Sequence, residues 1–382
     1  MVPALPRRPL LFISNGHGED GIAAAIIARL PDGMRAEAYP MIGAGNAFAG
    51  ICPIVGPRAT LASEGWRNVK GSLRRDVASG GLAIIPPALR FMRQCVGRYE
   101  RVVVVGDMVG VLAGLVTGHR DLFYIDVYKT GAARLYSAAE RWAIKRTCRT
   151  VFCRSPKLAE MLHSIGVDAR CAGNIMMDTV PNGAYDAAAR RTRALAVTLL
   201  PGSRQLTAES FALQVAALRT LPNEMRPDVF LAVAGSVNID ELARAADLGR
   251  IGLLSHEAND LGTLGEESLT INMARGAALG SLLAQSDLVL SQAGTATVQA
   301  LGLGKPVITF INPRDRRSRF NDEQNLFGEA RVVVAPQPTA IGEALRDLLE
   351  DTAKRTRLGA LGREHIGPPG AIEAVLAALV EA

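Results

Sequence analysis

Short, uninterrupted runs of apolar residues alternate with helix-like stretches along nearly the whole chain, and no other feature limits the fold as strongly. In the first half the predicted strands are Leu10–Ser14, Val102–Gly106, Leu122–Asp126 and Thr150–Cys153. After Pro181 the pattern restarts, with predicted strands at Ala196–Leu200, Val229–Ala234, Leu288–Ser291 and Val307–Phe310. Continuous apolar strands separated by helices are typical of parallel sheets that helices cover on both faces. The sequence therefore predicts two doubly wound, Rossmann-like α/β domains.

The length of the chain agrees with two domains, because 382 residues exceed the roughly 250–300 at which a single core stops growing. We predict an N-terminal domain over 1–180 and a C-terminal domain over 181–382, with the last helix available to pack back on the first domain. Helices are predicted at Glu19–Leu30, Val109–Val116, Leu135–Thr147, Ala208–Thr220, Ile239–Ala246, Ala274–Ala284 and Thr295–Gly302. Ligands of such folds lie beyond the carboxyl ends of the strands, so we expect the site in the cleft between the domains.

The two halves of the chain differ in charge. Residues 1–185 hold 23 Lys and Arg against 14 Asp and Glu, a net charge of +9, whereas residues 186–382 hold 20 against 23. A basic first domain favours an anionic partner such as an acidic lipid or a phosphorylated substrate, unless the arginines reflect only a biased codon composition. Nucleic acid is not expected as a partner, because aromatic residues are scarce and no nucleic-acid-binding motif is present.

Membrane spans, signal peptides and metal sites have no support in the sequence. No apolar run reaches the roughly 18–20 residues that cross a bilayer, and the run at 9–13 is too short for a signal peptide. The five cysteines form no C-x-x-C pair, so neither a disulfide framework nor a zinc site is expected. We expect a cytoplasmic protein.

The loop after the first strand carries Gly16, Gly18 and Gly21, which match the G-x-G-x-x-G dinucleotide fingerprint. Glu19 and Asp20, however, stand at the helix N-terminus where a pyrophosphate would bind, and their charge would repel it. This loop therefore does not favour NAD.

We interpret the same loop as part of an acceptor site. Glycines allow a ligand to approach the backbone closely, and His17 can act as a base near neutral pH. The alternative is that Glu19 and Asp20 only cap the helix and that His17 is a solvated loop residue.

Two loops of the second half favour a phosphate ligand. In the run Leu199–Arg204, Ser203 can donate to a phosphate oxygen and Arg204 can bind a diphosphate with its guanidinium fork; a surface turn is the alternative. In the run Ser291–Thr297 a helix begins without acidic residues, so its free N–H groups can attract a phosphate. The residues concerned are Gly294, Thr295 and Ala296, and Thr295 can alternatively be a simple helix cap.

A third stretch, Asn321–Asn325, completes the candidate donor site. Glu323 can accept both hydroxyls of a ribose, while Gln324 and Asn325 can bind phosphate or sugar. A plain helix cap is the alternative here as well.

Three motifs together resemble the lipid-A-disaccharide synthase family, which is a family of two-domain glycosyltransferases of the GT-B type. They are Leu199–Arg204, Ala172–Asp178, and the stretch from Gly294–Thr297 to Lys305-Pro306-Val307. The resemblance implies an inverting transfer of a glucosamine-type sugar from a UDP donor to a lipid acceptor at a membrane surface. It also implies that Ser203, Arg204, Thr295 and the stretch 323–325 hold UDP, and that Asp107 is an acidic residue of the acceptor side.

The first domain departs from the family pattern. The family's first loop reads G-E-x-S-G-D, whereas this chain has Asn15–Asp20, and Asn174 stands where the family usually has a histidine. The segment Tyr124–Thr130 replaces a tryptophan-rich stretch. We therefore expect a related but distinct branch, with a UDP-sugar 2-epimerase or a non-catalytic nucleotide-sugar-binding protein as alternatives.

Inverting transfer needs a base for the acceptor hydroxyl and a positive environment for the departing UDP. The sequence has no D-x-D pair, so we expect no metal or other cofactor. Arg204 and the helix start at Thr295 would stabilise the leaving group, and either Asp107 or His17 would be the base.

The segment 80–101 is a candidate membrane contact. Leu89, Met92 and Val96 share one helical face, and four arginines flank it, at positions 90, 93, 98 and 101. A basic amphipathic helix of this kind can lie on an anionic leaflet, so a peripheral location on the inner face of the cytoplasmic membrane is predicted. The alternative is core packing edged by solvated charges.

Overall fold

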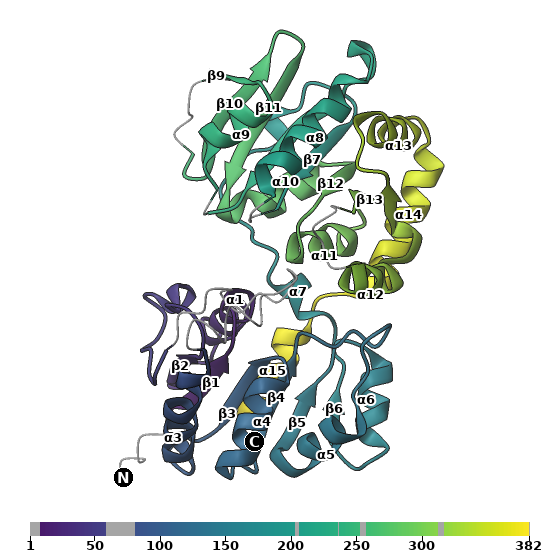
Figure 1. Ribbon diagram of the computed structural model, residues 1–382. Helices are drawn as coiled ribbons and strands as arrows, with labels where there is room; N and C mark the ends of the chain where they lie inside the picture. Colours follow the sequence, from purple (N-terminus) through teal and green to yellow (C-terminus); the bar gives the residue numbers. More distant parts are fainter. Residues whose placement is uncertain are drawn as a thin grey trace. The chain divides into compact units, whose positions relative to one another are not determined.

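The structure is a computed structural model that describes residues 8–58, 81–202, 206–235, 237–252, 257–311 and 317–381. The chain divides into two compact units, of which the first is Met1–Thr179 with Pro369–Ala382 and the second is Val180–Pro368 (Figure 1). The C-terminal segment after Pro368 thus lies in the first unit, a placement that the sequence analysis allowed for the last helix although it counted residues up to 382 in the second domain.

The first unit is built on a six-stranded parallel sheet with the strand order β2-β1-β3-β4-β5-β6. Its strands are β1 (Leu10–Ser14), β2 (Ala36–Pro40), β3 (Val102–Gly106), β4 (Leu122–Asp126), β5 (Cys148–Phe152) and β6 (Asp168–Arg170). Every residue of β1, β3 and β4 is buried, because helices cover both faces of the sheet.

Two helix layers cover this sheet. One face carries α1 (His17–Ile27) and α15 (Ala371–Glu381), whose apolar side chains share a core with Leu10 and Phe12 of β1. The other face carries α3 (Ile85–Cys95), α4 (Met108–Thr117), α5 (Ala138–Thr147) and α6 (Pro156–His163), which pack on Leu11 and Ile13. Successive residues of β1 thus point to opposite faces, as the period of a strand requires.

The apolar face predicted for the segment 80–101 is only partly exposed. Met92 and Cys95 of α3 are buried in the core between the sheet and the helices that cover it, whereas Arg90 and Arg93 on the same helix are exposed. Met92, in the middle of the predicted membrane-facing row, is therefore unavailable to a membrane, whereas Leu89 is half-buried and Val96 is 47% exposed.

The second unit has an eight-stranded sheet with the order β14-β13-β12-β7-β8-β11-β10-β9. Its strands are β7 (Ala196–Leu200), β8 (Asp228–Val233), β9 (Gly249–Gly252), β10 (Asp260–Glu266), β11 (Leu269–Arg275), β12 (Leu288–Ser291), β13 (Val307–Phe310) and β14 (Arg331–Val334). Strands β9, β10 and β11 form an antiparallel extension of the otherwise parallel sheet. The helix expected at Ala274–Ala284 begins only at Leu279, because β11 extends to Arg275.

The helices of the second unit and the short remaining helices complete the fold. The second unit contains α8 (Thr207–Arg219), α9 (Ile239–Ala245), α10 (Leu279–Gln285), α11 (Thr295–Gly302), α12 (Arg317–Phe327), α13 (Pro338–Glu350) and α14 (Thr352–Ile366). The short helices are α7 (Ile175–Asp178) and the 3-10 turns at Asn46–Phe48, Gly81–Ile84, Ala188–Arg190, Asn223–Met225, Gly276–Ala278 and Gly328–Ala330.

The prediction of two Rossmann-like α/β domains is confirmed. Among the described helices, none combines the length and the apolar character needed to cross a membrane.

Candidate functional site

The first unit has one point where the strand order reverses, between β1 and β3. From β1 the chain continues to β2 on one side, and β3 begins the series on the other side. The loops that follow the two strands at such a switch point diverge and leave a crevice between them. This crevice is the usual ligand site of an open parallel sheet. Asn15 and Gly16 follow β1 here, and Asp107 follows β3.

Asp107 is held in place by two hydrogen bonds. It caps the N-terminus of α4 by accepting from Val109 N at 2.9 Å, and Asn15 Nδ2 donates to it at 2.6 Å. Both bonds fall on Oδ1, and among the described residues no donor contacts Oδ2. The side chain is partly exposed, so Asp107 is an oriented carboxylate with one oxygen available to a ligand.

Gly106 allows β1 and β3 to end side by side. Its φ of 141° is a backbone conformation that other residues rarely adopt. A Cβ at this position would also collide with Oδ1 of Asn15. Glycine is thus required where Asn15 approaches the Asp107 loop.

The acidic residues Glu19 and Asp20 lie in the first turn of α1 and contact residues around the start of that helix. Ser14 Oγ donates to Asp20 Oδ1 at 2.5 Å, and Asp20 is buried. The Glu19 carboxylate folds back over Gly16, so closely that a Cβ on Gly16 would clash with it. Gly18 is exposed. The predicted acceptor-side roles of Glu19 and Asp20 thus compete with an observed structural role.

Two further predicted acceptor-side residues lie in the first unit. His17 is the first residue of α1, and its side chain lies outside the described residues. Asn174 is buried and caps α7 by accepting from Met176 N at 3.1 Å. The bond to Met176 gives Asn174 a structural role that sequence reasoning did not predict.

Sequence reasoning missed Asp126, which ends β4 beside Gly106 of β3. It is buried and accepts hydrogen bonds from Tyr128 N at 2.8 Å, from Lys129 N at 2.9 Å and from the Tyr136 hydroxyl. Burial raises the pKa of the Asp126 carboxyl above its ordinary value, against the effect of these hydrogen bonds. Asp126 therefore fixes the loop between β4 and α5. Its position at the carboxyl end of an apolar strand was the signal that could have found it.

The second unit has its switch point between β7 and β12, and two loops meet there. Gly202, with a φ of 103°, turns the chain after β7. Gln292 N donates to Leu200 O at 2.8 Å, which joins the start of the second loop to the end of β7. Ser203 and Arg204, the two predicted phosphate ligands of the first loop, lie outside the described residues.

Helix α11 begins at this switch point without a side-chain cap. Its first turn holds no acidic residue, Gly294 and Thr295 are exposed, and a Cβ on Gly294 would meet no described atom. The loop beneath is fixed by Ser291 Oγ, which lies 2.6 Å from Thr297 Oγ1 and accepts from Ala293 N at 3.1 Å. A rigid, uncapped helix start of this kind attracts an anion through its N–H groups and dipole.

The stretch Glu323–Asn325 lies on α12, and its three side chains differ. The Gln324 amide donates to Gly328 O at 2.8 Å and accepts from Arg331 Nε at 2.8 Å, so it attaches α12 to the buried Arg331. Glu323 forms an ion pair with the same arginine at 3.3 Å and stays partly exposed, while Asn325 is exposed. Burial lowers the pKa of Arg331, and Glu323 opposes this effect. Gln324 is therefore committed to the fold, whereas Glu323 and Asn325 remain accessible.

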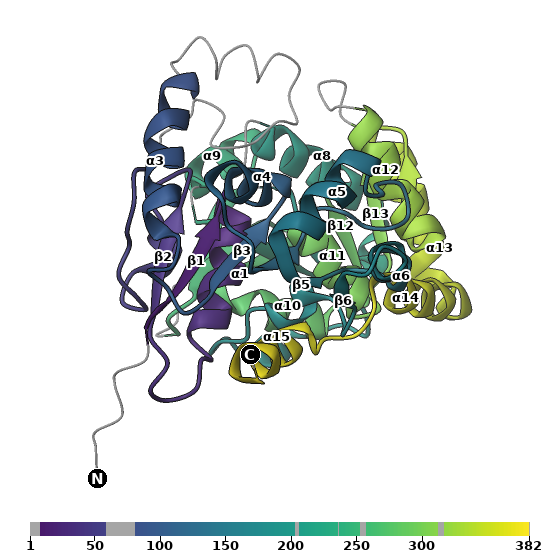
Figure 2. The same cartoon turned by 90° about the horizontal axis from the view of Figure 1, so that it is seen from below.

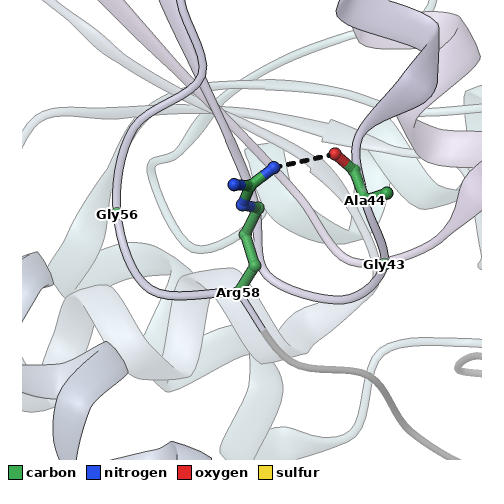
Figure 3. A pocket seen from close by; sticks show the side chains of 4 residues that line it. All are labelled: Gly43, Ala44, Gly56 and Arg58. Atoms are coloured by element: carbon green, nitrogen blue, oxygen red, sulfur yellow. Dashed lines mark hydrogen bonds between the residues drawn. The ribbon is translucent and has the colours of Figure 1, made fainter.

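An open pocket of about 460 Å³ lies in the loop after β2, lined by Gly43, Ala44, Gly56 and Arg58 (Figure 3). The Arg58 guanidinium donates to Ala44 O at 3.0 Å across it. The pocket contains none of the predicted site residues.

Within the described ranges, no group of three or more His, Cys, Asp or Glu side chains is placed to hold a metal ion.

The two Rossmann-like units give the chain the GT-B fold, as comparison with solved structures shows. The glycosyltransferase SnogD from Streptomyces nogalater is similar, with a TM-score of 0.56, 18% identity and coverage of 98% of this chain and 99% of that one. A putative UDP-N-acetylglucosamine 2-epimerase from Listeria monocytogenes reaches a TM-score of 0.61 at 15% identity, over 98% and 96% of the two chains. The S. aureus MnaA–UDP structure reaches 0.59 at 13% identity, with the same coverage. No protein-family model and no curated protein sequence matches this chain.

Proposed function

We propose that the protein is an inverting glycosyltransferase of the GT-B type, which moves a glucosamine-type sugar from a UDP donor to a lipid acceptor. The observation that carries the proposal is the uncapped N-terminus of α11 at the switch point of the second unit. Two of the similar structures support a UDP-sugar ligand, since one contains UDP and another is described as a UDP-N-acetylglucosamine epimerase.

The donor would bind at the carboxyl ends of β7 and β12. In the proposal the diphosphate lies on the first turn of α11, where N–H groups and the helix dipole favour negative charge. Ser203 and Arg204 add hydrogen bonds to the same phosphates, and Glu323 accepts the ribose hydroxyls. Gln324 is left out of the ligand set, because its amide is bonded to Gly328 and Arg331.

The acceptor would react at the switch point of the first unit. Asp107, or His17 in its place, accepts the proton of the acceptor hydroxyl while that oxygen bonds to the anomeric carbon. The bond from the anomeric carbon to UDP breaks at the same time, and the electron pair leaves with the diphosphate, where α11 and Arg204 stabilise the charge. No metal cofactor is part of the proposal, because the sequence contains no D-x-D pair.

A UDP-sugar 2-epimerase is the second candidate, favoured by the similarity to the Listeria monocytogenes structure. The two candidates differ in what they need. An epimerase converts its UDP-sugar alone, whereas a transferase releases UDP only when an acceptor hydroxyl is present. The lipid-A-disaccharide synthase resemblance of the second unit's motifs favours the transferase.

The first experiment is a thermal-shift titration with UDP, UDP-N-acetylglucosamine, GDP and NAD. Ligand at about 100 times Kd stabilises a protein by about 2.7 kcal/mol, so a bound nucleotide raises the Tm measurably. We expect a response to the UDP species that is lost in Arg204→Ala and retained in Arg250→Ala, which changes an exposed arginine of the same unit. A response to NAD without one to UDP would contradict the proposal.

A further inference from the structure

A short loop, residues 127–137, joins β4 to α5 at the carboxyl edge of the first unit's sheet. Helix α5 lies beside α4 on one face of that sheet (Figure 2). The Lys129 ammonium donates to Leu135 O at 3.1 Å and pairs with Glu140 at 2.8 Å. Together with the hydrogen bonds that Asp126 accepts from the backbone, these contacts give the loop a fixed shape.

This loop presents Tyr128 to solvent. Its side chain is 45% exposed, whereas the other five tyrosines of the chain are all buried. The Arg134 guanidinium lies over the Tyr128 ring, 4.4 Å from its centre, and so covers one of its two faces. The exposed remainder of the ring is an apolar surface of the kind that packs against the C–H groups of a sugar.

Arg154, two residues beyond the end of β5, lies against the same loop. Its Nη1 donates to Val127 O at 3.1 Å, and Val127 is the residue before Tyr128. Among the described residues, Nε of Arg154 has no hydrogen-bond partner, and no carboxylate forms an ion pair with the guanidinium. Burial lowers the pKa of Arg154, and Asp126 opposes this effect. A guanidinium removed from water in this way gains free energy when an anionic group of a ligand binds to it.

Asp107 stands on the other side of the tyrosine, one strand away. Val127 N donates to Gly106 O at 3.2 Å. The backbone that leads to Tyr128 is thus bonded to the backbone that leads to Asp107. Neighbouring strands are about 4.8 Å apart, so β3 and β5, with β4 between them, are about 10 Å apart. One hexose ring with a single substituent can bridge such a span.

We propose that Tyr128, Arg154 and Asp107 form an acceptor platform for a sugar that carries an anionic substituent. The hexose ring packs on Tyr128, its phosphate or carboxylate substituent binds to Arg154, and its reacting hydroxyl faces Asp107. Tyr128 and Arg154, which the proposed function leaves unused, thereby decide which acceptor is taken. The platform rests on the proposed function, because it binds the acceptor of the same transfer.

The test is the binding of three related probes, glucose, glucose 1-phosphate and glucuronate, to the full chain, titrated by saturation-transfer NMR without nucleotide. We expect the anionic sugar that matches the substituent to bind at least about ten-fold more tightly than glucose, the effect of one charge-assisted contact. Inorganic phosphate or acetate, added as a competitor, should bind at least about five-fold more weakly than the sugar with the same anionic group. Equal binding of all three sugars, or a free anion that binds as tightly as its sugar, would overturn the proposal.

Variants separate the roles of the two side chains. Tyr128→Ala should weaken binding of the anionic sugar at least about five-fold, and Tyr128→Phe should restore it, because phenylalanine keeps the ring. Arg154→Gln should remove the preference for the anionic sugar over glucose, while glutamine can still donate to Val127 O. Trp142→Ala, at a residue 56% exposed on α5, and Arg149→Gln, at an exposed arginine of β5, are the matched controls. A Tyr128→Ala chain that binds the anionic sugar as tightly as wild type would overturn the platform.

These outcomes are separate from those that test the donor site. Sugar binding is measured without UDP, and the UDP thermal shift is measured without an acceptor sugar. A chain that binds UDP but neither anionic sugar keeps its proposed donor and loses the acceptor platform. A chain that binds an anionic sugar but not UDP keeps the platform as a sugar site and loses the proposed transfer.

Discussion

Asp107 and Asp126 show how the surroundings of a carboxylate define its role. Asp126 lies beside Gly106, and Asp107 comes directly after that glycine, so both stand at the carboxyl edge of neighbouring strands. Asp126 is buried and receives three hydrogen bonds, which fix a loop. Asp107 is partly exposed and is oriented through Oδ1 alone. Of these two carboxylates, Asp107 is therefore the candidate for contact with a substrate.

Asp107→Asn is expected to lower kcat by about 10²- to 10⁴-fold, the range for loss of a general base. The amide can still accept from Val109 N, so the fold should be preserved. UDP binding, measured by thermal shift, should be unchanged, since the proposed donor site lies in the second unit. Asp121→Asn, at an exposed aspartate, is the control. If Asp107→Asn keeps full activity, His17 becomes the candidate base.

Asp126 should make the stability of the protein depend on pH. Its pKa is raised by burial, so the folded state holds the proton at pH values where the unfolded chain has released it. The contribution to stability is therefore present below the ordinary value of 3.8 and is lost as the pH rises through the folded-state pKa. Urea unfolding across this range should show wild type gaining stability relative to Asp126→Asn as the pH falls. A constant difference would contradict this assignment.

At the scale of elements, α1 and α11 both begin at a switch point but differ at their first turn. In α1, Asp20 is bonded to Ser14 and Glu19 folds over Gly16, so acidic side chains already occupy the helix start. In α11 no acidic residue and no side-chain cap is present. The positive end of α11 is therefore available to an anionic ligand, and that of α1 is not.

Thr295→Asp separates ligand binding from helix stability. A carboxylate in the first turn should leave the free energy of unfolding unchanged or raise it by about 0.3–1 kcal/mol, because it complements the dipole. The same charge should weaken UDP binding at least about ten-fold by repelling the diphosphate. Thr339→Asp, in the first turn of α13, is a control for the dipole effect. Unaltered UDP affinity in Thr295→Asp would remove α11 from the donor site.

At the scale of the molecule, the C-terminal helix α15 belongs to the first unit, although the residues just before it belong to the second. The Asp178 carboxylate accepts from Gly370 N at 2.7 Å and from Ile372 N at 3.0 Å, and so caps the start of α15. Ile372 and Val375 of α15 are buried in the same core as α1. The first unit is therefore complete only when the last residues of the chain have been added.

Asp178→Ala is expected to reduce the free energy of unfolding by about 1–2 kcal/mol, the usual cost of losing a helix cap. Hydrogen exchange should show faster opening of α15 than of the second unit's helices. Asp121→Ala, which changes an exposed aspartate of the same unit, should have no such effect. Equal exchange of α15 in the variant and wild type would mean that its apolar face alone fixes it.

The fold class could be predicted because it depends on local patterns. Continuous apolar runs such as those of β3 and β7 need cover on both faces, and the helices between them provide it. The extension β9–β11 was missed, since β10 and β11 are partly exposed and mix glycine and polar residues with their apolar ones. The short polar strand β6 gave no apolar signal either.

The residues of the candidate site were proposed from the sequence, and the contacts that they make required the structure. The sequence placed Asp107 and the α11 start at the ends of apolar strands, which is where parallel sheets bind ligands. It could not show that Gln324 is bonded to Arg331, that Asn174 caps α7 or that Asp126 fixes a loop. The Gln324–Arg331 bond joins α12 to a strand that only folding brings close, whereas the bonds of Asn174 and Asp126 to nearby N–H groups depend on how the local backbone turns.

The sequence by itself determined which segments are apolar and with what period, and hence the two parallel-sheet units. Only the tertiary structure decided which face of each helix is covered. The apolar face of α3 is buried at Met92, whereas α4, apolar on all sides, keeps Leu112 and Val116 in solvent. The physical reason is that periodicity is a property of one segment, while burial depends on what packs against it.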